Sequence, residues 1–163
     1  MIARVRGQQG FALIEMLIAI VVINIGLLAI LLALNSGMVT LRHSAESSTA
    51  SALADSQLER YRALAFAAVY LDTTSLAVTD STYQSDSAYS VSQVSQTCSP
   101  LVAACTPSQT VTGPDGRSYR VDTYIVSTTP AGGFAVKQVT VVVRKPGSPT
   151  ALARVVSTAG ADF

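Results

Sequence analysis

Gly10-Phe11-Ala12-Leu13-Ile14-Glu15 opens the stretch that decides the fold of this chain, an apolar run that ends near Leu34. Between Phe11 and Leu34 the only strongly polar side chains are those of Glu15 and Asn24. As a helix that rises roughly 1.5 Å per residue, this run would span about 36 Å, which is enough to cross a hydrocarbon core of about 30 Å. A charged carboxylate within a membrane helix is costly, although less so near the boundary. We therefore expect Glu15 to have a function that offsets this cost.

The flanks of the apolar run indicate its orientation and how it is processed. Arg4 and Arg6 precede the run, and no acidic residue does. The positive-inside tendency then keeps residues 1–10 in the cytoplasm and places everything after the run outside. The run is longer than the roughly 7 to 15 apolar residues of a secretory signal, and no good small-x-small cleavage site follows it. Because glycine lets a protease approach the backbone closely, we expect cleavage between Gly10 and Phe11.

These residues resemble the N-terminus of a type IV prepilin, in which a short basic leader ends in glycine and a long apolar helix follows. The matching positions here are Gly10, Phe11 and Leu13-Ile14-Glu15. Residues 24–29 further resemble PilV-type minor pilins and their type II secretion counterparts. The resemblance implies that a membrane prepilin peptidase cleaves after Gly10 and methylates the new amine of Phe11. It also implies that Glu15 pairs with the N-terminal amine of a neighbouring subunit during assembly.

The resemblance also implies partners and a location. The subunit would be held by lipid in the inner (cytoplasmic) membrane as a single-pass protein with its C-terminal part outside. It would then join other pilin or pseudopilin subunits through their N-terminal helices, on an inner-membrane assembly platform, and reach the pilus or cell surface. Ala12 stands where many pilins have threonine, and no proline occurs from Phe11 to Ala68. The missing proline favours a minor subunit over the main building block.

The expected function is therefore a minor pilin or pseudopilin, a structural subunit that primes a type IV pilus-like fibre or decorates its tip. A type II secretion or DNA-uptake pseudopilin shares the same N-terminus. A different class is a signal-anchored membrane protein that displays a binding domain, which predicts an uncut Met1. An extracytoplasmic hydrolase is disfavoured because the chain has one histidine. We expect no enzyme activity and no cofactor.

Composition supports an exported domain beyond the membrane run. The chain has 163 residues, and its 11 basic and 10 acidic side chains leave a net charge of +1. Without a strong basic field, no nucleic-acid partner is predicted. The expected organisation is a leader at 1–10, a transmembrane and assembly helix at 11–34, an amphipathic continuation of the helix at 35–70, and an extracytoplasmic β-rich part at 71–163.

The continuation of the helix has one apolar face. Small and apolar residues recur at three- and four-residue steps, which places them together on the face that should pack on a sheet. The opposite side is charged, and Glu59 with Arg62 is spaced for an i,i+3 pair. The apolar face consists of Ala50, Leu53, Ala54, Leu58, Tyr61, Leu64, Ala65 and Ala68.

The β-rich part reads as an antiparallel meander. Alternating residues predict strands at 118–127, 134–145 and 152–157, with a weak strand at 88–94. Pro/Gly-rich turns between the three better strands are short enough for hairpins. The stretch from Asp72 to Asp86 is rich in Ser, Thr and Asp and reads as a surface loop. The fold class is therefore α+β and pilin-like, with a long N-terminal helix on a three- to four-stranded antiparallel sheet.

Few other residues suggest chemistry. Cys98 and Cys105 are the only cysteines and lie in the part predicted to be outside, so we expect a disulfide between them. Two free or metal-binding thiols are the alternative. His43 is expected to be a solvated or interfacial residue just outside the membrane. Asp80 and Asp86 show no spaced ligand pattern for calcium, so no metal site is predicted.

Overall fold

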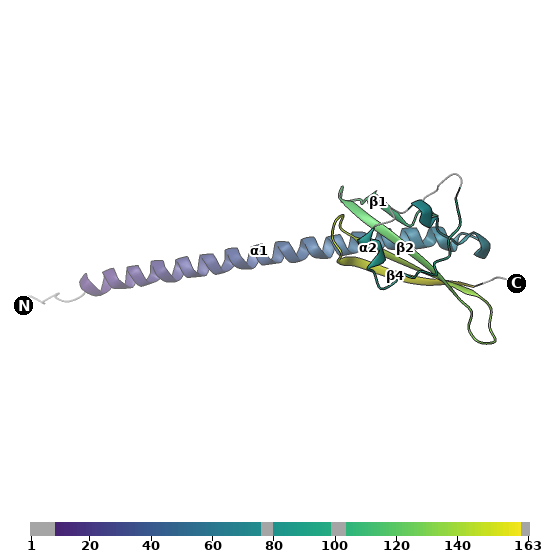
Figure 1. The fold of residues 1–163 in the computed structure, drawn as a ribbon. Helices are drawn as coiled ribbons and strands as arrows, with labels where there is room; N and C mark the ends of the chain where they lie inside the picture. The colour runs from purple at the N-terminus through teal and green to yellow at the C-terminus, as the bar shows by residue number, and fades with distance from the viewer. Residues whose placement is uncertain (1–8, 76–79, 99–103, 161–163) are drawn as a thin grey trace, which may run out of the picture. The chain divides into compact units, whose positions relative to one another are not determined.

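The computed structural model describes residues 9–75, 80–98 and 104–160, and it describes side chains from Leu13 onward apart from that of Ser75. The chain divides into two compact units, Met1–Ser44 and Ala45–Phe163. We call the second unit the head. The elements follow the order α1, η1, η2, α2 and then four strands, as Figure 1 shows.

Helix α1 (Gln9–Arg62) contains 54 residues and includes no proline. Gly26 and Gly37 lie inside it without a break in the helix. The helical periodicity predicts that the helix continues to residue 70, but α1 ends at Arg62. After Arg62 the Leu64 N–H donates to the Tyr61 carbonyl, which is an i→i−3 hydrogen bond. Ala65 then adopts an extended conformation before the short 3-10 helix η1 (Phe66–Ala68).

A distant lysine binds the segment that follows the helix. The Lys137 ammonium donates to the carbonyls of Phe66 (2.7 Å) and Val69 (2.8 Å) and lies over the Phe66 ring. Because Lys137 is 71 residues away from Phe66, a local sequence pattern cannot predict this contact.

The head contains one antiparallel sheet of four strands in the order β1-β2-β3-β4. Strands β2, β3 and β4 form the predicted meander. The fourth strand was expected at residues 88–94, and this prediction is wrong: that segment contributes an isolated bridge between Gln93 and Val126. The short polar strand β1 takes that place instead. The strands are β1 (Ser108–Thr112), β2 (Ser118–Thr128), β3 (Val136–Arg144) and β4 (Ala151–Gly160).

One face of the sheet packs against the last turns of α1. The alternation in β2 and β3 predicts which residues share a face, and the buried core confirms it. From the helix, four members of the predicted apolar face are buried in this core, which shows that periodicity located the packing side correctly. The core contains Ala50, Ala54, Leu58, Tyr61, Tyr119, Val121, Ile125, Val139, Val141 and Val143.

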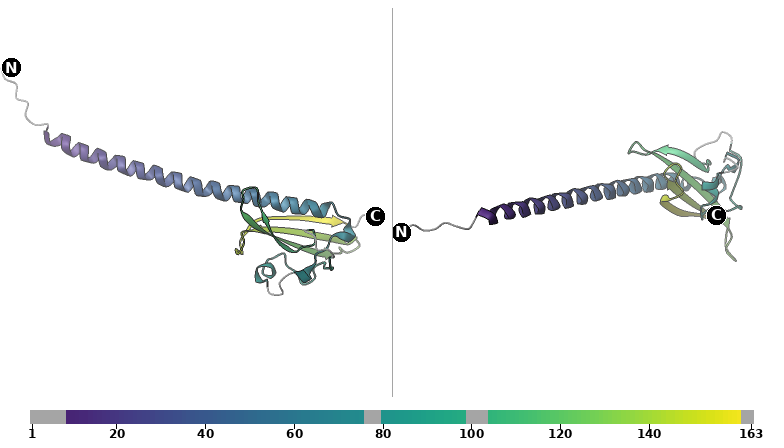
Figure 2. Two further views of the ribbon diagram at one scale, coloured as in Figure 1. Left: turned by 90° about the horizontal axis from the view of Figure 1, so that it is seen from above. Right: turned by 60° about the vertical axis from the view of Figure 1, so that its left-hand side comes forward.

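The other face of the sheet is covered as well, which the sequence analysis did not predict. The stretch expected to be a surface loop includes the short 3-10 helix η2 (Thr73–Ser75) and helix α2 (Ser81–Gln84). Tyr83 of α2 is fully buried and stacks on Tyr124 with ring centroids 4.3 Å apart. Figure 2 shows the resulting three layers of the head, with the sheet between the end of α1 and the α2 segment.

Candidate functional site

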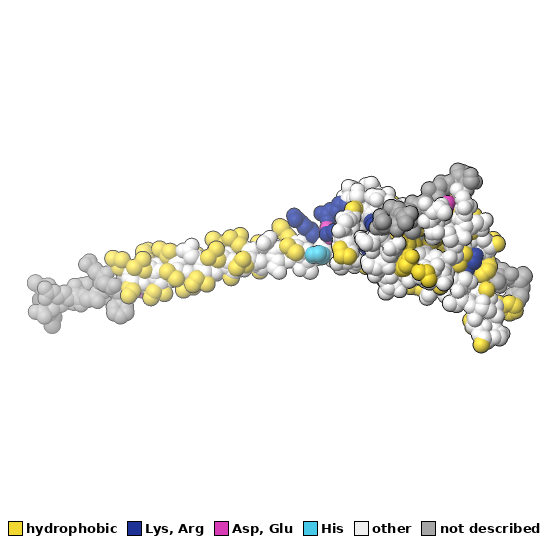
Figure 3. Space-filling view, in the orientation of Figure 1, with side chains coloured by type: hydrophobic (Ala, Val, Ile, Leu, Met, Phe, Trp, Pro, Cys, Tyr) yellow, Lys and Arg dark blue, Asp and Glu magenta, His cyan; other side chains and the backbone are white. Residues whose placement is uncertain are grey.

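The first unit presents an apolar helix surface. Every side chain described from Leu13 to Leu41 is exposed, and the apolar side chains of this stretch follow α1 along the face shown in Figure 3. This part of α1 is long and apolar enough to cross a membrane. Such a surface costs free energy in water, so it needs lipid or other helices around it.

Few polar side chains occur in this stretch, and they differ in whether they have a hydrogen-bond or ion-pair partner within the chain. The Asn24 side-chain amide donates to the Ile20 carbonyl at 2.7 Å, which satisfies it within its own helix. Glu15 is exposed, and among the residues whose side chains are described none forms an ion pair with it. Glu15 is the one charged side chain described between Leu13 and Leu41.

The predicted cleavage position lies at the beginning of α1. The backbone of Gly10 and Phe11 is helical, and their side chains are outside the described set. Phe11 precedes Glu15 by four positions, and residues four apart in a helix lie on the same face. The leader residues before Gln9, including Arg4 and Arg6, lie outside the described residues.

The remaining residues singled out by the sequence lie in the head or near it. Cys98 and Cys105 form a disulfide. The Asp72 backbone N–H donates to the Cys105 carbonyl, and the Asp72 carboxylate accepts from the Cys98 N–H. The disulfide is thereby attached to the layer that covers the sheet. His43 is exposed.

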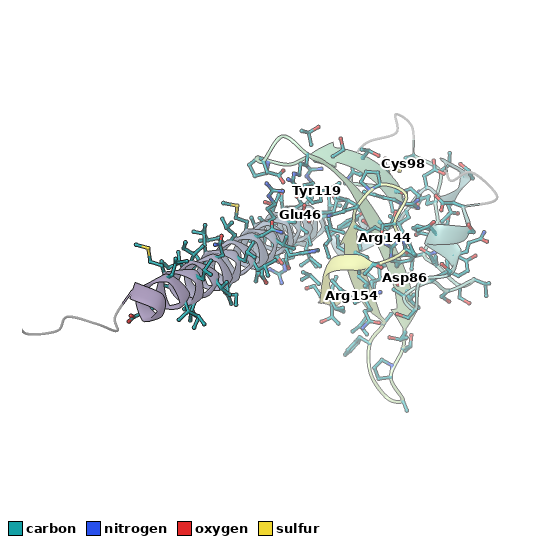
Figure 4. All side chains as sticks on the ribbon, turned by 90° about the vertical axis from the view of Figure 1, so that its left-hand side faces the viewer. Glu46, Asp86, Cys98, Tyr119, Arg144 and Arg154 are labelled. Atoms are coloured by element: carbon teal, nitrogen blue, oxygen red, sulfur yellow. A yellow bond between two sulfur atoms is a disulfide. The ribbon has the colours of Figure 1, made fainter. Side chains whose placement is uncertain are left out.

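A cluster of six charged residues joins the covering layer to the sheet, and the sequence analysis missed it. We call Asp80, Asp86, Arg120, Asp122, Arg144 and Arg154 the ion-pair cluster. Asp122 and Arg144 are almost completely buried and lie 2.5 Å apart. Arg144 also contacts Asp86 at 2.5 Å, and Arg154 contacts Asp86 at 2.8 Å. Figure 4 shows Arg144, Asp86 and Arg154 close together.

Asp80 completes the cluster at the other end. Arg120 donates to Asp122 at 2.8 Å and to Asp80 at 2.7 Å, and Asp80 also caps α2 by accepting from the Tyr83 N–H. Burial opposes ionisation of Asp80, but the Tyr83 N–H and Arg120 hold its pKa below the ordinary value. Asp80 and Asp86 are thus engaged by arginines, and no cluster of metal-ligating residues occurs among the described residues.

A separate ion-pair group lies where the head begins. Glu46 of α1 is buried and pairs with Arg117 and with Lys145, the latter at 2.6 Å. Arg117 follows β1 and Lys145 follows β3, so one carboxylate of the helix holds two turns of the sheet. This group is structural, because each of its charges already has an opposite charge.

A cleft of about 310 Å³ lies between the α2 segment and the turns around residue 91. Its lining is rich in hydroxyl and amide groups, but Asp80 is held by Arg120, and the Tyr83 hydroxyl donates to the Thr123 carbonyl and contacts the Gln93 side-chain amide. The described geometry therefore leaves this cleft without a distinct catalytic arrangement.

The family comparison agrees with the geometry of the N-terminal unit. Residues 5–31 match the family model of the prokaryotic N-terminal methylation motif. Comparisons with curated proteins and with solved structures gave no match. The motif, the transmembrane-capable helix and the helix-on-sheet head define a type IV prepilin-like protein with an α+β, pilin-like architecture. More particularly, the motif supports a pilin-like or pseudopilin-like structural subunit, and the apolar N-terminal helix is consistent with membrane anchoring.

Proposed function

We propose that this chain is a minor pilin or pseudopilin that is cleaved between Gly10 and Phe11, N-methylated on Phe11 and assembled into a type IV pilus-like fibre. The methylation motif at residues 5–31 carries the proposal. The exposed apolar surface of α1 from Leu13 to Leu41 also supports the proposal. A surface of that extent can be buried among the helices of other subunits. The subunit acts by packing and surface presentation and is a substrate of processing enzymes.

Glu15 has a specific task in this proposal. Cleavage gives Phe11 a cationic amine, and Glu15 of one subunit neutralises the amine of another as both enter the helix bundle. Apolar packing supplies most of the assembly energy, and the ion pair sets the register, since an unpaired charge in a low-dielectric bundle is strongly disfavoured. A processed subunit therefore assembles, and an uncut one does not.

The test compares Glu15→Gln and Glu15→Ala with Asn24→Ala, which removes a polar side chain that its own helix satisfies. We expect all three variants to insert into the membrane. The two Glu15 variants should reach sheared surface material at least about tenfold less than the native chain, the equivalent of roughly 1.4 kcal/mol per subunit, whereas Asn24→Ala should reach it normally.

The mass of the N-terminal peptide is measured in the same fractions. N-methylated Phe11 in the sheared fraction supports processing and export. An intact Met1 in cells with an active prepilin peptidase indicates a signal-anchored protein that displays a binding domain. Normal assembly of Glu15→Gln refutes the pairing role alone.

A type II secretion or DNA-uptake pseudopilin is the second candidate, because the same N-terminal motif serves those systems. The fraction that contains the methylated chain separates the candidates. A pilus subunit is found in long sheared fibres, whereas a pseudopilin stays with the envelope.

A further inference from the structure

The sheet of the head ends in two edge strands, β1 and β4. β4 has ten residues and pairs with β3 alone. Among the described residues, the other backbone contact of β4 is the Ser47 hydroxyl, which donates to the Leu152 carbonyl at 3.4 Å. From Arg154 to Gly160 the free edge contains no proline, no lysine and no acidic residue.

Proteins usually protect such an edge with charges, prolines or a covering segment, because its unpaired N–H and C=O groups are a template for another strand. The single charge of β4 is Arg154, and its guanidinium is turned to Asp86 of the same head. β1, at the opposite edge, has five uncharged residues, Ser108–Thr112. Neither edge therefore carries a charge that would repel a partner strand.

The strand directions decide which edge can meet which. The three pairings of the sheet are antiparallel, so β1 and β4 run in opposite directions. α1 runs in the direction of β4, because Ser47 contacts Leu152 and Arg62 contacts Ser157 at 3.5 Å. Two copies that pair β4 with β4 in antiparallel fashion would have their α1 helices reversed.

Under the proposed function, copies of this chain share one membrane or one fibre. Their heads then have the same orientation, and a pairing between their edge strands rests on that function. Between two such copies, β4 of one and β1 of the next are antiparallel, as are all strand pairs within the sheet. The exposed residues of the two edge strands are also suited to pair with each other. Thr110 and Thr112 of β1 and Val156 and Thr158 of β4 are exposed on the face opposite α1, and β-branched residues favour cross-strand pairs.

We propose that β4 of one copy pairs edge to edge with β1 of a second copy of this chain, which continues the sheet from head to head. The contact is heterologous, so a pair of copies keeps one unpaired β1 edge and one unpaired β4 edge. It adds backbone hydrogen bonds between heads to the helix packing that holds the N-terminal parts.

The test uses the full-length chain in membranes of cells that make two differently tagged copies. One copy carries Thr110→Cys, and the other carries Val156→Cys or Thr158→Cys. Opposed residues of an antiparallel pair have Cβ atoms about 4.5–5.5 Å apart, which mild oxidation can convert into a disulfide. The native cysteines do not compete, since Cys98 and Cys105 are already joined. Ser87→Cys, an exposed position outside both edge strands, is the control.

We expect a cross-link between the two tagged copies when one cysteine is on β1 and the other on β4, and none with Ser87→Cys. Adding Val156→Lys to the Thr158→Cys copy should lower the yield roughly fivefold, because a charge on an edge strand opposes pairing. Cross-links that join Thr158→Cys only to itself, or only to a different protein, overturn the proposal.

The absence of any cross-link also overturns it, and the N-terminal peptide then separates the two proposals. If methylated Phe11 is still found in the sheared fraction, the edge pairing is wrong and the pilin function stands. If the cross-link forms while Met1 is intact, the pilin function fails and the edge contact remains.

Discussion

At the scale of single residues, Arg144 shows how a charge is used inside the head. It lies in a strand segment otherwise made of valines, and it is 1% exposed. Asp122 and Asp86 neutralise it from two different elements. A buried ion pair gains little over an apolar pair, but the loss of one partner leaves an uncompensated charge in a low dielectric. The residue therefore specifies how the covering layer is attached to the sheet.

Arg144→Met should lower the free energy of unfolding by about 3 kcal/mol, because Asp122 and Asp86 lose a buried partner. Arg62→Met is the matched control: Arg62 pairs with Glu59 on the surface, so its loss should cost within about 0.5 kcal/mol. Urea unfolding in detergent, followed by tyrosine near-UV circular dichroism, measures both, since every tyrosine lies in the head. Equal effects of the two substitutions would contradict the role of Arg144.

At the scale of elements, the turn between β1 and β2 is attached to α1. The Gly113 N–H donates to the Arg117 carbonyl at 2.8 Å, and Arg117 pairs with Glu46 of the helix. A methyl group added at Gly113 would lie 2.8 Å from Thr49 of α1 and 2.9 Å from the Tyr119 ring. Glycine is needed there for space, because the turn approaches the helix this closely.

Gly113→Ala should therefore destabilise the head by about 1–3 kcal/mol, the usual cost of overpacking. Gly133→Ala is the control, since its added methyl would make ordinary contacts with Pro130 at 3.5 Å. The thermal midpoint of the tyrosine signal reports both. An unchanged midpoint for Gly113→Ala would show that the turn does not pack on α1 as described.

At the scale of the whole molecule, the head is held together by an apolar core on one face of the sheet and by ion pairs around a small tyrosine–valine cluster on the other. Burial opposes ionisation of Asp86, but the Ala88 N–H and the arginines 154 and 144 hold its pKa below the ordinary value. The pKa of Asp80 is lowered in the same way. A carboxylate with a lowered folded-state pKa binds protons more weakly in the folded than in the unfolded head, so acid weakens the fold.

We expect the unfolding free energy to be constant above the unfolded-state pKa of about 3.9 and to decrease as the pH falls through the lower folded-state values. Asp86→Asn should be less stable at neutral pH and should show a shallower loss in acid. The measurement is a series of urea titrations between about pH 7 and pH 2.5. A native chain whose stability does not change over this range would refute the role of the ion-pair cluster.

The interpretation from sequence succeeded where the signal is local. The apolar run, the apolar face of the helix near Leu58 and the β2-β3-β4 meander follow from period and turn chemistry, and the resemblance to prepilins agrees with the methylation motif at residues 5–31. Glu15 could be identified from the residues next to it in the sequence. Its pairing with a neighbour stays a prediction, because that contact lies between chains.

The tertiary structure decided what depends on residues far apart in the chain. Lys137 binds the Phe66 carbonyl beyond the end of α1, and Arg120 binds Asp80, which lies 40 positions away in the sequence. The polar strand β1 forms because β2 offers its edge, and the Tyr83 layer forms because Tyr124 and Val142 leave an apolar face to cover. Short-range patterns determine the kind of element that each stretch forms, whereas the partner of a buried charge or a sheet edge is selected only when the chain has folded.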